Sequence, residues 1–216
     1  MEDNKTNSCY LHGVIAKELT LAFERKGERF FDTVLRTERT SGTEDEIPLT
    51  IPERLLCDGL DIGDTVTVVG QFRSWNEFEG EKRKLKLAVF VREFLDEHVM
   101  NETNVITIKG YVGKNASIRS TPFGRKITDL LLSVPRQFNK NDHIPVIAWG
   151  NNAVFADTFQ TGEKIALRGR IQSREYNKAD KNGNVVVMKA LEVSVSELSI
   201  IDEIKDYGFD LIKEVA

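Results

Sequence analysis

The chain has few of the residues from which catalytic and metal centres are usually built. Its 216 residues include only two cysteines, Cys9 and Cys57, and three histidines that are widely separated in sequence. No Cys-x-x-Cys pair, metal-ligand spacing or glycine-rich phosphate loop occurs, so buried thiols are more plausible than a disulfide framework or a zinc site. We therefore expect no enzyme, no cofactor and no metal.

Long apolar runs are also missing. No segment approaches the about 18 apolar residues of a membrane span. The N-terminal residues 1–5 are polar and acidic, unlike a signal peptide. These features predict a cytoplasmic protein. With 40% hydrophobic and 30% charged residues, the chain has the composition of an ordinary globular protein of one large or two small domains.

Charge is unevenly distributed. The formal net charge is −4, but residues 1–103 carry 14 Lys and Arg against 21 Asp and Glu, whereas residues 104–216 carry 16 against 13. A basic region is the electrostatic footprint of phosphate binding. Any nucleic-acid site is therefore expected in the second half.

An internal repeat divides the chain. Two copies of one pattern lie about 97 residues apart, which is the length of a small domain. The matched pairs include Gly13 and Gly110, Lys17 and Lys114, Gly27 and Gly124, Asp32 and Asp129, and, with a shift of two, Gly70 and Gly169, and Ser74 and Ser173. The predicted domains are residues 1–100 and 104–200, followed by a tail at 201–216.

Most of each repeat is predicted to form β-strands. The candidates are residues 10–16, 30–36, 47–51, 65–75 and 85–94 in the first repeat, and 105–112, 127–134, 144–149, 164–176 and 185–198 in the second. Short helices are expected near residues 53–57 and 151–159, and Asn182-Gly183 is a hairpin turn signal. Five strands with a helix between the third and fourth is the OB-fold order. We predict an all-β chain of two tandem OB-folds.

The run from Ile165 to Tyr176 alternates apolar and basic residues. Ile165, Leu167, Gly169 and Ile171 share one face, and Arg168, Arg170, Gln172 and Arg174 share the other. A cationic strand face with aromatic residues nearby suits nucleic acid, because phosphates need cations and bases stack on flat rings. An ordinary solvated strand face would show the same alternation.

Three segments of the second repeat resemble the bacterial single-stranded DNA-binding protein family. They are Ile118 to Gly124, Ile144 to Gly150 and Gly162 to Tyr176, and the resemblance covers about residues 104–200. It implies an OB-fold that binds single-stranded DNA without catalysis and supports replication, recombination or repair. The stacking positions that it implies fall on Phe138, Trp149 and Tyr176. A fourth aromatic position of the family is His143 here.

Further candidates come from the residues themselves. Phe123 lies at an expected hairpin tip and could stack on DNA or pack on a neighbouring subunit, and Trp75 could stack in the first repeat. The candidate phosphate-binding cations are Lys114, Arg119, Arg125, Lys126, Arg136, Lys140, Arg168, Arg170 and Arg174.

The first repeat departs from the pattern. Pro52, Glu77 and Ser41 stand where the second repeat has Trp149, Tyr176 and Phe138, and residues 41–46 are acidic. One basic cluster, residues 82–86, remains. We expect the first repeat to be the weaker binder, or a structural and assembly module.

By analogy with the family, whose assemblies usually present four OB-folds, a homodimer is expected. The tail lacks a flexible linker and ends in Val-Ala, so recruitment of replication or repair proteins through it is in doubt. The alternative function is an OB-fold scaffold protein of a primosome-like complex with weak or no DNA binding.

Overall fold

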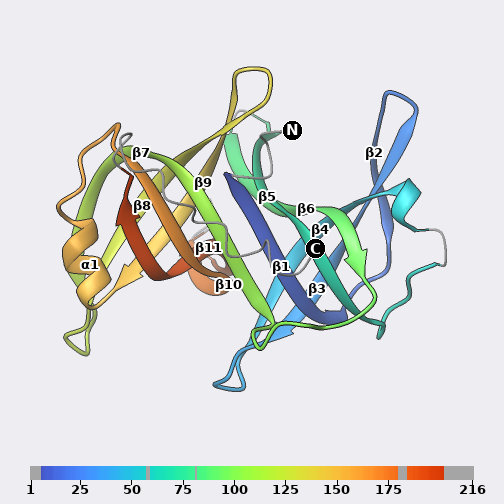
Figure 1. The fold of residues 1–216 in the computed structure, drawn as a ribbon, viewed down its shortest axis with the longest axis horizontal. Helices are drawn as coiled ribbons and strands as arrows, with labels where there is room; N and C mark the ends of the chain where they lie inside the picture. Colours follow the sequence, from blue (N-terminus) through green and yellow to red (C-terminus); the bar gives the residue numbers. More distant parts are fainter. Residues whose placement is uncertain (1–5, 57–58, 81, 180–183, 202–216) are drawn as a thin grey trace.

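The computed structural model describes residues 6–56, 59–80, 82–179 and 184–201. The first half contains β1 (Asn7–Ile15), β2 (Thr20–Arg25), β3 (Glu28–Glu38), β4 (Glu44–Pro52), the 3-10 helix η1 (Glu53–Leu55), β5 (Thr65–Glu79) and β6 (Lys82–Leu95). The second half contains β7 (Asn104–Ser120), β8 (Lys126–Arg136), β9 (Lys140–Trp149), α1 (Asn151–Ala156), β10 (Lys164–Ala179) and β11 (Val185–Ile200) (Figure 1). The all-β prediction is confirmed. Cys57, the Asn182-Gly183 turn and the tail after residue 201 lie outside the described residues.

The strands of each half pair into a closed ring. In the first half the order is β1, β3, β4, β6 and β5, with β5 returning to β1. In the second half the order is β7, β8, β9, β11 and β10, with β10 returning to β7. Only the third and fifth strands of each ring run parallel. This pairing and the helical turn after the third strand follow the OB-fold order.

Strand β2 was not predicted. It pairs only with β3 and all six of its residues are exposed, so no buried periodicity marks it. Its counterpart in the second half is the continuation of β7 beyond Lys114, which pairs with β8 through two register shifts.

The two rings join edge to edge. Strand β1 pairs antiparallel with β7, from Asn7 opposite Ile108 to Leu11 opposite Asn104, and one 11-stranded sheet results (Figure 1). An asparagine side-chain amide in each half makes an equivalent hydrogen bond beside this seam. Nδ2 of Asn7 donates to the carbonyl of Phe72 at 2.7 Å, and Nδ2 of Asn104 donates to that of Ile171 at 2.7 Å. These matching bonds show that the sequence repeat is a structural repeat with approximate two-fold symmetry.

Two matched glycines fix the curvature of the rings. Gly70 and Gly169 lie where the fourth strand shifts register against the fifth. A Cβ atom at Gly70 would lie 2.6 Å from the carbonyl oxygen of Phe90, and one at Gly169 would lie 2.2 Å from that of Ser194. Any larger residue would force the strands apart, so both repeats need glycine at this position.

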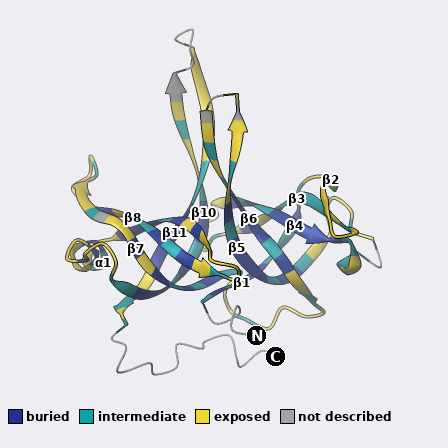
Figure 2. Cartoon of the chain, turned by 90° about the horizontal axis from the view of Figure 1, so that it is seen from above, coloured by how far each residue is buried: buried dark blue, intermediate teal, exposed yellow. Residues whose placement is uncertain are grey.

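The interior of each ring is apolar. Leu11, Leu35 and Phe72 are fully buried in the first, and Leu132, Ile144 and Leu167 in the second. Cys9 is buried with them, and burial raises the pKa of its thiol. The hairpins β5–β6 and β10–β11 extend beyond the rings as two arms on the same side of the molecule (Figure 2). Among the described residues, no helix has the length and apolar character needed to cross a membrane.

Candidate nucleic-acid interface

The outer face of strands β7, β8 and β9 carries an exposed tryptophan beside an arginine. The antiparallel register places Arg119 opposite Ile127 and Ile127 opposite Trp149, so these three side chains form a row on one face. The neighbouring residues Thr128 and Ala148 lie on the opposite face of the sheet, toward the core, and are fully buried. Trp149 is 37% exposed at the end of its strand. Its ring can therefore be reached from solvent.

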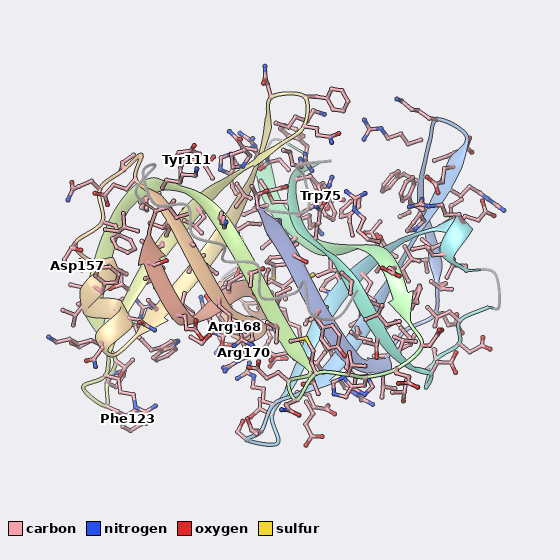
Figure 3. The ribbon with its side chains drawn as sticks, viewed as in Figure 1. Trp75, Tyr111, Phe123, Asp157, Arg168 and Arg170 are labelled. Carbon is pink, nitrogen blue, oxygen red and sulfur yellow. The ribbon has the colours of Figure 1, made fainter. Side chains whose placement is uncertain are left out.

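The β7–β8 hairpin, whose second strand pairs with the end of β9, carries a second exposed ring and two cations. Phe123 is 93% exposed at the hairpin tip, next to Gly124 at a φ of 76° (Figure 3). Arg125 and Lys126 follow and are exposed. The carbonyl of Lys126 accepts a hydrogen bond from the N–H of Gly150 at 3.0 Å, which ties the hairpin to the end of β9. Within the described residues, neither cation has a carboxylate at ion-pair distance.

Arg119 is differently placed. Its Nε donates to Oδ2 of Asp129 at 2.7 Å. This hydrogen bond raises the pKa of Arg119, and the charges of Asp129 and Glu192 add to the effect. The charge of this guanidinium is therefore already balanced by a carboxylate. Lys114, further along β7, is exposed and unpaired among the described side chains.

The arm formed by β10 and β11 holds the predicted tyrosine. The guanidinium of Arg174 lies 5.7 Å from the ring centroid of Tyr176, which is half-buried. Nε of Arg174 is also 3.5 Å from Oε1 of Glu192 at the base of the arm. Glu192 acts electrostatically on both Arg119 and Arg174, so both cations lie near this carboxylate.

The β8–β9 hairpin presents Phe138 at the opposite end of β8 from Phe123. Phe138 is 87% exposed, with a φ of 62° that belongs to a tight turn. Lys140 beside it is exposed, whereas Arg136 turns inward to Asp142, 3.4 Å away. At about 3.3 Å per residue, the 11 residues of β8 separate the two phenylalanine tips by roughly 35 Å.

The basic face predicted on β10 is divided in the structure. Ile165, Leu167, Gly169 and Ile171 are buried as expected. On the other face, Gln172 is buried, Arg168 binds the carboxylate of Glu102 and Arg170 is half-buried. These two arginines lie at the junction with the first ring, because that ring covers this part of the strand (Figure 3). The structure does not bring them together with Trp149 and Phe123.

The first ring differs from the second at the place that matches Trp149. Pro52 lies opposite Phe30, where Trp149 lies opposite Ile127 in the second ring. The neighbouring arginines are paired, Arg29 with Glu53 and Arg54 with Glu28. Trp75 is elsewhere, on β5: it is 37% exposed and meets the ring of Phe90 edge-on at 6.1 Å.

An exposed ring on the outer face of the second ring was missed from the sequence. Tyr111 on β7 is 39% exposed and pairs with Ser133, which pairs in turn with His143. It therefore shares the outer face with Trp149. The alternation of Tyr111 with buried Gly110 and Val112 was the available signal.

A family model now accounts for this half of the molecule: residues 103–201 match the model of the single-strand binding protein family. The second half of the chain is therefore similar to that family. The match includes all the second-half residues discussed above and leaves the first ring outside it. None of the curated proteins compared matches the chain.

Solved structures support the fold of the whole chain. The wild-type single-stranded DNA binding protein from Thermus aquaticus is 20% identical, with a TM-score of 0.68 over 91% of this chain and 93% of that one. A deletion mutant of the same protein is 18% identical, with a TM-score of 0.67 over 94% and 97%. The dimeric N-terminal domain of PriB protein from Thermoanaerobacter tencongensis is 37% identical over 41% of this chain and 93% of that one, with a TM-score of 0.37.

Proposed function

We propose that the protein binds single-stranded DNA without catalysis and with little sequence preference. The match of residues 103–201 to the model of the single-strand binding protein family supports this function. Exposed rings accept bases of any sequence, and each stacked base contributes roughly 1–3 kcal/mol. The role that we propose for it is protection of single strands in replication, recombination or repair, in the cytoplasm at the nucleoid.

One observation carries the proposal. Trp149 and Phe123 are exposed beside Arg125 and Lys126, and neither cation is neutralised by a carboxylate of the described residues. A ring for the base and an uncompensated charge for the phosphate are what a single strand requires. The matching place in the first ring has Pro52 instead of the tryptophan.

The path of the strand follows from this geometry. We place it along the outer face of β8, from Trp149 and Phe123 at one end to Phe138 at the other. Lys114 and Lys140 lie within reach of the backbone along this path, and Arg174 with Tyr176 border it from the arm. Arg119 and Arg136 are paired with Asp129 and Asp142 and would exchange these carboxylates for phosphate. Trp75 is a separate position on the first ring.

The test is a titration with oligo-dT at several salt concentrations. Four uncompensated cations, Lys114, Arg125, Lys126 and Lys140, each contribute about −0.7 to the slope of log K against log salt, so a slope of roughly −3 is expected. Replacing both Arg125 and Lys126 by Gln should reduce its magnitude by about 1.4. Absence of binding, or binding that salt does not weaken, would favour a protein-binding scaffold instead.

The assembly remains a prediction. Because each chain has two rings, we propose a homodimer that presents four, which light scattering of the free protein at several concentrations can measure. Recruitment of replication or repair proteins is also a proposal, tested by the same method with the candidate partner added.

A further inference from the structure

A cavity of about 530 Å³ opens where the two rings meet, away from the outer face of β8. Its walls come from three segments: the end of β3 and the turn after it, the linker between the rings, and the middle of β10 and β11. The residues that matter here are Thr40, Arg39, Arg170 and Ser194. Arg170 is labelled at this junction, close to Arg168 (Figure 3).

The positive charges around this cavity are not equally balanced. Arg39 donates from Nε and Nη2 to the two oxygens of Asp45, at 2.7 and 2.5 Å. Arg168 is paired with Glu102. Arg170, by contrast, has a single acceptor among the residues that the structure describes, the amide oxygen of Gln172, at 3.1 Å from its Nη2. Among the described residues, no carboxylate lies at ion-pair distance from it.

A second feature of Arg170 points to a missing acceptor. Its Nε is buried and has no hydrogen-bond partner in the described part of the chain. Buried polar groups in folded proteins nearly always have a partner, so a donor left without one inside a cavity is available to an acceptor that enters the cavity. Burial lowers the pKa of Arg170, and the charge of Arg39 lowers it further against the opposing effect of Asp45.

The repeat provides an internal comparison. At the symmetry-related junction, Gln71 occupies the position of Arg170, and the corresponding space is only about 10 Å³. The amide oxygen of Gln71 accepts hydrogen bonds from Arg73 and, at 2.8 Å, from Arg92. The same scaffold thus gives Gln71 hydrogen-bond partners in a space that is almost filled, and leaves Arg170 with an unpaired Nε in an open cavity.

We propose that the junction cavity is a binding site for a phosphate group, with Arg170 as its cation. A guanidinium with a free Nε–H offers the fork of donors that matches phosphate oxygens. Hydroxyl groups of Thr40 and Ser194, from two of the lining segments, suit the remaining oxygens of a tetrahedral anion. The exposed carboxylate of Glu38 also lines the cavity and limits the charge that it accepts. The phosphate could be free in solution or part of a DNA backbone, and binding of inorganic phosphate does not depend on the proposed function.

The first experiment uses inorganic phosphate alone. Thermal unfolding and phosphorus NMR line widths are measured in phosphate and in chloride of equal ionic strength. Wild-type protein should be stabilised by phosphate and broaden its resonance. Arg170→Gln places the residue of the other junction, Gln71, at this position. Its affinity for phosphate should be lower than that of wild type by a factor of about ten or more. Arg25→Gln removes one exposed charge on β2 and should behave as wild type. No stabilisation of wild type, or an equal response of Arg170→Gln, would overturn the proposal.

The second experiment identifies the source of the phosphate. If the ligand is a DNA backbone phosphate, phosphate should compete with oligo-dT, and Arg170→Gln should reduce the salt slope by about 0.7. If the ligand is a free anion, wild-type protein should bind phosphate, and Arg170→Gln should bind oligo-dT with the affinity of wild type. Either result supports the site, provided that the first experiment shows binding. If wild-type protein binds phosphate but does not bind oligo-dT, the result would contradict the proposed function and leave the phosphate site supported.

Discussion

The N–H of Ser173 in the second ring donates a 2.7 Å hydrogen bond to Oδ1 of Asp45 in the first. The repeat reverses this contact: the N–H of Ser74 in the first ring donates to Oδ1 of Asp142 in the second, also at 2.7 Å. Both carboxylates are buried. Each ring therefore supplies one acceptor to the other, and the seam between them is specified by polar contacts as well as by the pairing of β1 with β7.

Removing Asp45 should destabilise the whole chain. Asp45→Ala leaves the guanidinium of Arg39 without its carboxylate and the N–H of Ser173 without its acceptor. Breaking a buried charge pair in this way costs roughly 3–5 kcal/mol. Urea unfolding of the full chain measures the loss. Asp129→Ala is the control, since its pair with Arg119 is exposed and such pairs contribute at most about 1 kcal/mol. Equal losses would contradict a structural role for the buried contact.

Stability should depend on pH through Asp142. Burial raises the pKa of this carboxyl, and the bonds and charges of Ser74, Arg136 and Arg73 only partly offset it. Because this pKa is raised above its ordinary value of 3.8, the folded state binds the proton more tightly than the unfolded state. The free energy of unfolding relative to Asp142→Asn should therefore rise as pH falls from neutral towards 4, by linkage.

The measurement is a pair of urea titrations, wild type and Asp142→Asn, across that pH range. The difference between them removes the contributions of all other carboxyl groups. A difference that falls on acidification would mean that ion pairing with Arg136, rather than burial, controls this group.

The exposed ring of Phe123 should affect binding and not stability. Since it is 93% exposed, Phe123→Ala should leave the urea midpoint unchanged. Loss of one stacked base should weaken oligo-dT binding by roughly 1–2 kcal/mol. Phe78→Ala, which removes a 71% exposed ring on the arm of the first ring, is the matched control and should bind as wild type. If Phe123→Ala binds normally, the ring is available for packing on a neighbouring subunit instead.

The strands and the positions of the tips could be predicted from local pattern. Alternation marked β3, β4, β8 and β9, and turn residues marked the tip at Phe123, which is fully exposed as expected. Local pattern could not show that Arg168 reaches Glu102, because the partner lies in the linker and is placed by the pairing of β1 with β7. The solvent face of β10 was predicted without knowledge that a second ring would cover part of it.

The repeat itself was visible, but its consequence was not. Ser74 and Ser173 were matched in the sequence, yet their role depends on Asp142 and Asp45, which lie in the opposite rings. Such contacts follow from the relative placement of the two rings. A pattern confined to one strand contains no information about it.

Fluorescence of the two tryptophans tests the central claim most directly, because the chain has one in each ring. In Trp75→Phe only Trp149 remains, and in Trp149→Phe only Trp75 remains. Titration of both variants with oligo-dT should strongly quench Trp149 and affect Trp75 weakly. Quenching of Trp75 alone would place the DNA on the first ring and contradict the account.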